Sequence, residues 1–305
     1  MKTSPTKNNA PILSIVILNY NSGEYLKNCL QSLYQSTFPQ KKFEIIIADN
    51  ASIDNSLSLA KTISTPSTKY LVLTTNQGFA YGNNRGIEAT NPDSKYLLFL
   101  NPDTTVEKDT LEKMVDFFEK NKKVDAATCS MTLVSTGALQ PECHRDFPTP
   151  LNAFLHFSGI SSRQYFMEYL DFAKTQKINA CSGAFLMVKR EVGNAIGWWN
   201  EKYFFYGEDL DFGYKLKQFG FQLWFYPGCK ISHFQGISSG IIEKSKHLSK
   251  ASRSTKIKIA KASTEAMRIF YQENLFSKYS IFTQTLVLGG IKLLEIFRVF
   301  KAKYL

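Results

Sequence analysis

The sequence predicts an α/β fold with a central, mostly parallel β-sheet, followed by a helical extension at the C-terminal end. Two observations lead to this prediction. Between residues 12 and 100, four short apolar runs alternate with three amphipathic stretches, which is typical of βαβ units. The chain has 305 residues, of which 44% are hydrophobic, so it can bury the core of one large domain plus a modest appendage.

The first third of the chain contains four expected strands separated by helices. The apolar runs of these strands cover residues 12–18, 43–48, 70–74 and 96–100. Asn21 and Glu24 have the spacing of a capping box before the first helix. Asp54 can cap a second helix over residues 57–63, and a third helix follows Gly78.

The rest of the chain is less regular. The expected elements are helices over 111–118 and from Glu208, and strands over 124–134, 178–188, 221–226 and 230–234. After Gly240 the chain becomes basic and helical.

Positive charge is concentrated at the C-terminal end. The net charge is +11, and residues 241–305 supply +9 of it from 13 Lys and Arg against four Glu. The remaining body is nearly neutral, which argues against a nucleic-acid-binding protein. The basic extension is expected either to meet something anionic, such as a lipid surface, or to be a solvated basic helix.

Cysteine usage indicates a reducing compartment. The five cysteines lie far apart without a CxxC pair, a pattern that supports neither a zinc cluster nor a disulfide framework. The apolar run over residues 12–18 is followed by Asn19–Asn21 and by no small-residue cleavage site, so we interpret it as a strand and not as a signal peptide. A cytoplasmic location is therefore expected.

Polar residues follow each of the first four strands, at the edge where open parallel sheets bind ligands. Asn19 follows the first strand, Asp49 and Asn50 follow the second, and Asn76–Gly86 follows the third. Asn101-Pro102-Asp103 follows the fourth. Each segment alone could be a turn, but their joint occurrence predicts a ligand site. The absence of GxGxxG and GxxxxGK[ST] weighs against a dinucleotide fold and a P-loop.

An acidic cluster opens the helix at Glu208. Glu208, Asp209 and Asp211 could simply complement the helix dipole. Aromatic residues crowd positions 198–206 just before them, however, and an apolar wall raises a carboxyl pKa into the range of a general base. His233 is either structural or a metal ligand beside this cluster.

Seven segments together resemble the inverting family 2 glycosyltransferases with the GT-A fold, and more narrowly their bacterial rhamnosyltransferase-like branch. They are SIVILNYNSGEYLKNCLQSL, IIIADNASIDNS, NQGFAYGNNRGI, LLFLNPDTTV, SGAFLMVKREV, IGWWNEKYFFYGEDLDFGYKLKQFGF and ISHFQGISS. The resemblance implies a catalytic domain over residues 1–240, with a nucleotide-binding half at about 10–105 and an acceptor half at about 106–240. Residues 241–305 would form the basic helical tail.

The resemblance also implies which residues surround a nucleotide-sugar donor linked to dTDP or UDP. They are Asn19, Asp49, Asn50, Asn76, Gly78, Asn84, Asn101, Ser182, Gly183 and Ala184. Asp49 would accept the N3–H of a uracil or thymine ring, and Ser182–Ala184 would pass near the sugar. Arg145 could contact the diphosphate or an acceptor phosphate, or lie in a surface loop.

Metal and catalytic roles follow from the same resemblance. Asp103 stands in the family's DxD motif and would hold Mg²⁺ or Mn²⁺, with His233 as the second ligand. Asn101 departs from DxD, and its neutral amide would bind the cation more weakly. Glu208 and Asp209 are the expected catalytic residues, and Asp209 is the one that matches the family's catalytic base.

The implied function is the metal-dependent, inverting transfer of a sugar to a hydroxyl group. The best match is L-rhamnose from dTDP-rhamnose, and the acceptor would be a cell-surface polysaccharide or a lipid-linked oligosaccharide precursor. A UDP-hexose-dependent family 2 transferase and a catalytically silent nucleotide-sugar-binding scaffold stay open as alternatives.

The tail contains one nearly continuous apolar stretch over residues 281–300. Lys292, Glu295 and Arg298 interrupt it. An apolar stripe remains, formed by Leu286, Gly290, Leu293, Leu294, Phe297 and Phe300. This pattern favours an amphipathic helix lying on the inner face of the plasma membrane. The alternative is a helix packed on the catalytic domain or on a second subunit of a homodimer.

Overall fold

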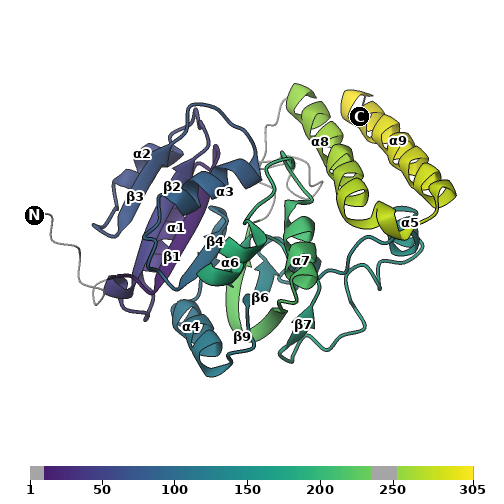
Figure 1. The fold of residues 1–305 in the computed structure, drawn as a ribbon. Coiled ribbons are helices and arrows are strands. Elements are labelled where there is room, and N and C mark those ends of the chain that lie inside the picture. Colours follow the sequence, from purple (N-terminus) through teal and green to yellow (C-terminus); the bar gives the residue numbers. More distant parts are fainter. Residues whose placement is uncertain (1–9, 235–252, 305) are drawn as a thin grey trace, which may run out of the picture.

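The computed structural model describes residues 10–234 and 253–304 and places all their strands in one mixed sheet. The strand order is β3-β2-β1-β4-β8-β6-β9-β5, and β7 pairs with β9 (Figure 1). The first four strands are β1 (Leu13–Asn19), β2 (Phe43–Asp49), β3 (Thr68–Val72) and β4 (Tyr96–Leu100). They pair in parallel, which confirms the four predicted strands.

Three helices connect these strands: α1 (Glu24–Tyr34), α2 (Ser56–Lys61) and α3 (Phe79–Glu88). α1 packs against α2, and α3 lies over β1 and β2. Gly82 and Gly86 allow this close approach, since a Cβ at either position would lie within 2.5 Å of the Leu18 or Val16 side chain. The prediction of a capping box at Asn21 and Glu24 is wrong. The α1 N-cap is Gly23, because Asn21 adopts a left-handed φ of 50° and accepts a hydrogen bond from the Ile53 N–H.

The second half of the domain contains both parallel and antiparallel pairs. Its elements are β5 (Thr104–Val106), α4 (Thr110–Lys120), β6 (Ala126–Leu133), α5 (Pro150–Phe157), β7 (Gln176–Ile178), β8 (Phe185–Lys189), α6 (Arg190–Ile196), α7 (Glu208–Gln218) and β9 (Leu223–His233). Short 3₁₀ turns cover Gln40–Lys42 and Pro141–Cys143. The sequence patterns missed β5, α5 and α6.

Two strand predictions in this half are wrong. The strand expected over 178–188 is interrupted at 179–184, because Ala180 and Ser182 bond to the backbone of the 142–145 loop. The strands expected over 221–226 and 230–234 are one strand, β9, and its register against β6 shifts around Pro227–Cys229.

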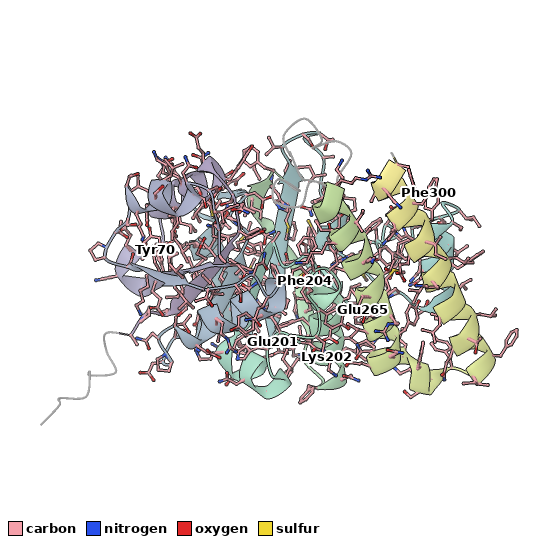
Figure 2. The ribbon with its side chains drawn as sticks, turned by 90° about the horizontal axis from the view of Figure 1, so that it is seen from above. Tyr70, Glu201, Lys202, Phe204, Glu265 and Phe300 are labelled. Atoms are coloured by element: carbon pink, nitrogen blue, oxygen red, sulfur yellow. The ribbon has the colours of Figure 1, made fainter. Side chains whose placement is uncertain are left out.

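The C-terminal helices pack on the helix that carries the acidic cluster. α8 (Arg253–Phe270) contacts α7, and α9 (Ile281–Tyr304) runs beside α8 at the end of the molecule away from β3 (Figure 1). A π-helical turn (Tyr271–Leu275) and a 3₁₀ turn (Phe276–Lys278) join them. Nδ2 of Asn274 donates to Asp211 at 3.0 Å, so the tail is tied directly to α7. In Figure 2, Tyr70 on β3 and Phe300 on α9 mark the two ends of the molecule.

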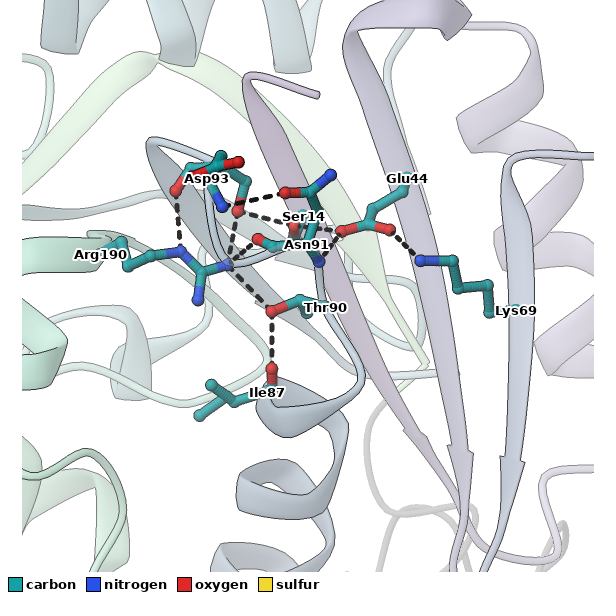
Figure 3. Close-up of polar contacts among 9 residues, drawn as sticks. Ser14, Glu44, Lys69, Ile87, Thr90, Asn91, Asp93 and Arg190 are labelled. Atoms are coloured by element: carbon teal, nitrogen blue, oxygen red, sulfur yellow. Dashed lines mark hydrogen bonds and ion pairs between the residues drawn. The ribbon is translucent and has the colours of Figure 1, made fainter. Parts of the chain in front are cut away.

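A buried polar network closes the sheet at the amino ends of its parallel strands (Figure 3). The Glu44 carboxylate accepts hydrogen bonds from the Ser14 hydroxyl at 2.7 Å, from the Asn91 N–H at 2.5 Å and from Lys69 at 2.8 Å. Nε of Arg190 donates a hydrogen bond to the Ser94 carbonyl oxygen, which lies in the loop before β4. This network lies at the edge opposite the polar strand ends, so it supports the sheet and stands apart from the candidate site.

Candidate functional site

The ends of β1 and β2 place Asn19 and Asp49 side by side. The two residues are register partners, and Nδ2 of Asn19 donates to Oδ1 of Asp49 at 2.6 Å. The Ser52 N–H donates to Oδ2 at 3.1 Å, and both Asn19 and Asp49 are buried. Because a carboxylate offers about four lone-pair positions, Asp49 is held in place and still has capacity for a ligand donor.

Asn50 and the 76–78 segment form the next part of this edge. Nδ2 of Asn50 donates to Oδ1 of Asn76 at 2.9 Å and to the Gly78 carbonyl oxygen at 3.2 Å. Oδ1 of Asn50 is buried and has no hydrogen-bond partner among the described residues. Gly78 has a φ of +99°, and a Cβ there would lie 2.2 Å from the Phe204 carbonyl oxygen. The loop after β3 therefore needs glycine to dock against the loop before α7.

Asn84 is engaged within the protein. Its Nδ2 donates to the Trp199 carbonyl oxygen at 2.9 Å and to Glu201 at 2.8 Å, and its Oδ1 accepts from the Trp199 N–H. In this structure Asn84 holds the 198–201 segment on α3. Direct contact with a nucleotide stays a prediction, and it requires some of these bonds to open.

Asp103 and His233 are brought together by the pairing of β5 with β9. Nε2 of His233 lies 3.2 Å from Oδ1 of Asp103, and both side chains are buried. Nδ1 of His233 lies 2.7 Å from Oε1 of Gln140. An amide oxygen can only accept a hydrogen bond, so Nδ1 carries a proton and Nε2 faces the carboxylate. Nε2 of His233 and Oδ1 of Asp103 therefore face each other and could share a cation.

This donor set fits a divalent cation. Two atoms bound at adjacent positions of one octahedral ion lie about 3 Å apart, close to the 3.2 Å between Asp103 and His233. Within residues 10–234 and 253–304, no group of three or more His, Cys, Asp or Glu converges as a metal site. Such an ion would therefore take most of its ligands from the diphosphate and water. Asn101 is anchored through its backbone, whose N–H donates to Ala184 at 3.0 Å.

The acidic cluster places three carboxyls in different environments. Burial, together with the charge of Asp209, raises the pKa of Glu208 well above its ordinary value. Burial also raises the pKa of Asp211, which is held by Asn274 and by the Tyr203 hydroxyl. Asp209 forms an ion pair with Arg145. The three neighbouring carboxyls thus differ in burial and in their partners.

The 140–145 loop connects the two halves of the site. Gln140 contacts His233, and Arg145, five residues later, contacts Asp209. The Arg145 side chain is 11% exposed, which excludes the surface-loop alternative. Between these contacts, the Glu142 carbonyl oxygen accepts the Ser182 N–H at 2.8 Å.

The 182–184 segment lies against the aromatic wall. The Ser182 hydroxyl accepts the Ala184 N–H, and a Cβ on Gly183 would lie 2.9 Å from the Phe79 ring. Phe79 packs edge-on against Trp199 at 5.3 Å. These contacts link the loops after β3 and β4 to the segments before β8 and α7. The predicted residues thus fall into two linked groups, one around Asp49 and one that joins Asp103–His233 to Arg145–Asp209.

Two features of the site were not identified from sequence. Gln140 was not assigned a role, because nothing in the local pattern shows that it meets His233. Left-handed backbone at four non-glycine residues borders the site, and such strain concentrates at functional sites. These residues are Asn21, Ala51, Trp198 and Tyr206.

Two surface hollows lie away from the predicted site residues. One, of about 490 Å³, lies between α8 and α9, and the other, of about 540 Å³, lies beside Asp146. Neither is lined by Asp49, Asp103 or Asp209.

Comparison with known sequences agrees with this geometry. A family model described as glycosyl transferase family 2 matches residues 14–197. The N-acetylglucosaminyl-diphospho-decaprenol L-rhamnosyltransferase of Mycobacterium tuberculosis is 24% identical over 265 residues, which cover 82% of this chain and 84% of the relative. The poly-beta-1,6-N-acetyl-D-glucosamine synthase of Staphylococcus epidermidis is 23% identical over 217 residues, covering 70% of this chain and 48% of the relative.

Solved structures show the same architecture. A mannosyltransferase of Pyrobaculum calidifontis in complex with GDP-Man and Mn²⁺ aligns with 99% of this chain and 75% of its own, at a TM-score of 0.57 and 14% identity. S. aureus TarS 1-349 in complex with UDP-GlcNAc aligns with 95% of this chain and 90% of its own, at a TM-score of 0.54 and 15% identity. The likeness confirms the predicted GT-A fold.

Proposed function

Because the chain belongs to glycosyl transferase family 2 and is a glycosyltransferase, we propose that it transfers its sugar with inversion and uses Asp209 as the base. The observation that carries this proposal is the different surroundings of two neighbouring carboxyls at the start of α7. Asp209 forms an ion pair with Arg145, whereas burial and the charge of Asp209 raise the pKa of Glu208. Asp209 is therefore the carboxylate available to take the acceptor proton.

The reaction is a single displacement. The acceptor hydroxyl attacks the anomeric carbon and gives its proton to Asp209, while the nucleoside diphosphate leaves from the opposite face. Asp49, Asn50 and the 76–78 segment would orient the nucleoside. Asp103 and His233 would hold Mg²⁺ or Mn²⁺, which neutralises charge on the diphosphate. The 182–184 segment would line the sugar.

L-rhamnose from dTDP-rhamnose is our proposed donor chemistry, and the acceptor is a surface polysaccharide or its lipid-linked precursor. The rhamnosyltransferase relative from Mycobacterium tuberculosis supports this choice, since the similarity spans most of both chains. A UDP-hexose donor is the second candidate, supported by structural neighbours that contain UDP or UDP-GlcNAc. A silent scaffold is disfavoured because Asp49, Asp103 and Asp209 are all present and each contacts a polar partner.

A pair of matched variants tests the catalytic assignment. Asp209→Asn should lower transfer by roughly 10²- to 10⁴-fold while leaving nucleotide-sugar affinity nearly unchanged. Glu208→Gln mimics the protonated acid and should keep most of the activity at pH 7. The donor for these assays is identified first, by screening dTDP- and UDP-sugars for the one that the wild-type protein slowly hydrolyses. Full activity in Asp209→Asn would disprove the base.

We further propose that the protein docks on the anionic inner face of the plasma membrane. None of the helices in the described parts of the chain has the length and apolarity needed to cross a bilayer. α9 instead turns its apolar stripe away from α8. Its large exposed apolar residues are Ile281, Phe282, Leu286, Leu293, Ile296, Phe297, Phe300 and Tyr304. Ile291, on the opposite face, is buried in the cluster that includes Phe270 of α8.

α5 lies next to α9 and carries exposed apolar residues of its own. Leu151 and Phe154 of α5 are exposed, and the Arg298 guanidinium of α9 lies 5.5 Å from the Phe157 ring. Lys292 on α9 is also exposed. Since residues 241–305 carry a net charge of +9, the surface complements anionic lipid, whereas a second copy would bring two positive tails together.

A further inference from the structure

Arg145 reaches Asp209 from a distant part of the chain. Nη2 of Arg145 forms an ion pair with Oδ2 of Asp209, and the two side chains are only 11% and 14% exposed. The backbone of Arg145 is fixed as well, since its N–H and C=O pair with Ala180 at 2.7 and 2.9 Å. A β-bridge therefore holds the backbone that carries the arginine in place.

In the part of the chain that the structure describes, the other titratable groups that act on this pair carry no positive charge. They are Glu142, Tyr165, Cys181 and Glu208, with Asp211 further along α7. Lys215 pairs with Asp211, and Arg298 interacts with Tyr165. Burial and Asp209 raise the pKa of Glu208, whereas the Arg145 charge lowers it. Among the described residues, Arg145 is therefore the cation that contacts Asp209 and also acts on Glu208.

We propose that Arg145 is a positioning residue, whose ion pair with Asp209 holds that carboxylate in the orientation in which it takes the acceptor proton. This inference rests on the proposed role of Asp209 as the base. Oδ1 of Asp209 accepts the Leu210 N–H at 2.8 Å, and Oδ2 accepts from Arg145. A carboxylate has further lone-pair positions, so one stays available for the acceptor hydroxyl.

The competing role for Arg145 is contact with the donor diphosphate. Its buried Nε–H has no partner among the described residues and could serve such a contact. The two roles differ in what they change. A positioning residue affects the pH at which the base works, whereas a diphosphate ligand affects donor affinity at every pH.

The test is the pH dependence of kcat/KM in Arg145→Gln and Arg145→Lys, with donor Kd measured by calorimetry. Arg145→Gln should move the acid limb of the profile upward by about 1–3 pH units, since an adjacent Arg shifts a carboxylate by that much. Arg145→Lys should shift the acid limb less than Arg145→Gln does, because lysine keeps the positive charge but lacks the planar guanidinium group. Donor Kd should change by less than about threefold in both variants.

Matched controls keep the outcome interpretable. Arg268→Gln removes an exposed arginine paired with Glu265 on α8 and should leave the profile unchanged. An unchanged acid limb in Arg145→Gln, or a tenfold weaker donor affinity without a limb shift, would overturn the inference. Asp209→Asn distinguishes this failure from a failure of the proposed function. If Asp209→Asn is active, Asp209 is not the base and the proposed function itself is refuted. If Asp209→Asn is inactive but the Arg145 variants have the wild-type pH profile, only the positioning role is refuted.

Discussion

Gln140 and His233, 93 positions apart in the chain, are joined by a 2.7 Å contact between Oε1 and Nδ1. The contact orients the imidazole so that Nε2 faces Asp103 at 3.2 Å. Such an outer partner fixes the tautomer of a ligating histidine and raises its basicity. Gln140 therefore supports the proposed metal site by orienting His233, without being one of the proposed ligands.

Removal of this partner should weaken metal binding. We expect Gln140→Leu to raise the Mn²⁺ concentration needed for half-maximal activity by about 10- to 100-fold. Asp103→Ala should have at least the same effect, because it removes a ligand. Mn²⁺ titration of activity and calorimetry on the folded protein measure both. Gln31→Leu, at an exposed position on α1, is the control; an unchanged titration in Gln140→Leu would show that His233 needs no partner.

Gly78→Ala should destabilise the protein and abolish donor binding. The new Cβ would meet the Phe204 carbonyl oxygen at 2.2 Å, in addition to the backbone strain of φ +99°. We expect a loss of about 2–4 kcal/mol in the free energy of unfolding. Gly137→Ala is the matched control, since Gly137 has a φ of +68° but open space around it. It should cost only about 1 kcal/mol, and equal losses in the two variants would refute the clash.

The Glu44 network predicts a pH-dependent contribution to stability. Although burial opposes ionisation, the bonds from Lys69, Asn91 and Ser14 lower the pKa of Glu44 below its usual 4.5. Stability from this group is therefore present above the unfolded pKa and lost as pH falls through the lower folded pKa. Glu44→Gln should destabilise the protein by about 1–3 kcal/mol at pH 7.

Urea unfolding from pH 7 to pH 3 measures this effect. The difference between wild type and Glu44→Gln should shrink below about pH 4.5, where the unfolded glutamate takes up its proton. Glu88→Gln is the control, because the Glu88 side chain is 61% exposed and forms a surface pair with Arg85. That variant should change stability by less than about 0.5 kcal/mol at either pH. A constant difference for Glu44→Gln at all pH values would contradict the assignment.

Membrane docking should depend on the outward face of α9. Leu293→Glu with Phe297→Glu should abolish sedimentation with vesicles containing anionic lipid, while donor hydrolysis in solution stays intact. Lys261→Glu, on α8, changes a charge by the same amount on another helix and should weaken binding only modestly. Size-exclusion chromatography tests the alternative, in which a second copy of the chain binds α9. If the wild type is a dimer that does not bind vesicles, and the double variant is a monomer, α9 is a subunit interface and not a membrane-binding helix.

The local sequence determined the first half of the fold and the identity of the polar strand ends. Continuous apolar runs predict strands buried on both faces, and polar residues directly after them must gather at one edge, because parallel strands end on the same side. Asn19 and Asp49 lie together for this reason. The strand expected over 178–188 failed because its apolar composition carries no sign of the loop that pairs with Ala180.

Only the tertiary structure decided which partners meet across long separations. Arg145 and Asp209 are 64 positions apart, and Gln140 and His233 are 93 apart, so no helical or strand period connects them. The amphipathic pattern of α9 likewise shows an apolar stripe without saying which way it points. Its outward orientation depends on how Ile291 packs against α8, since burial of one helix face leaves the other to solvent or lipid.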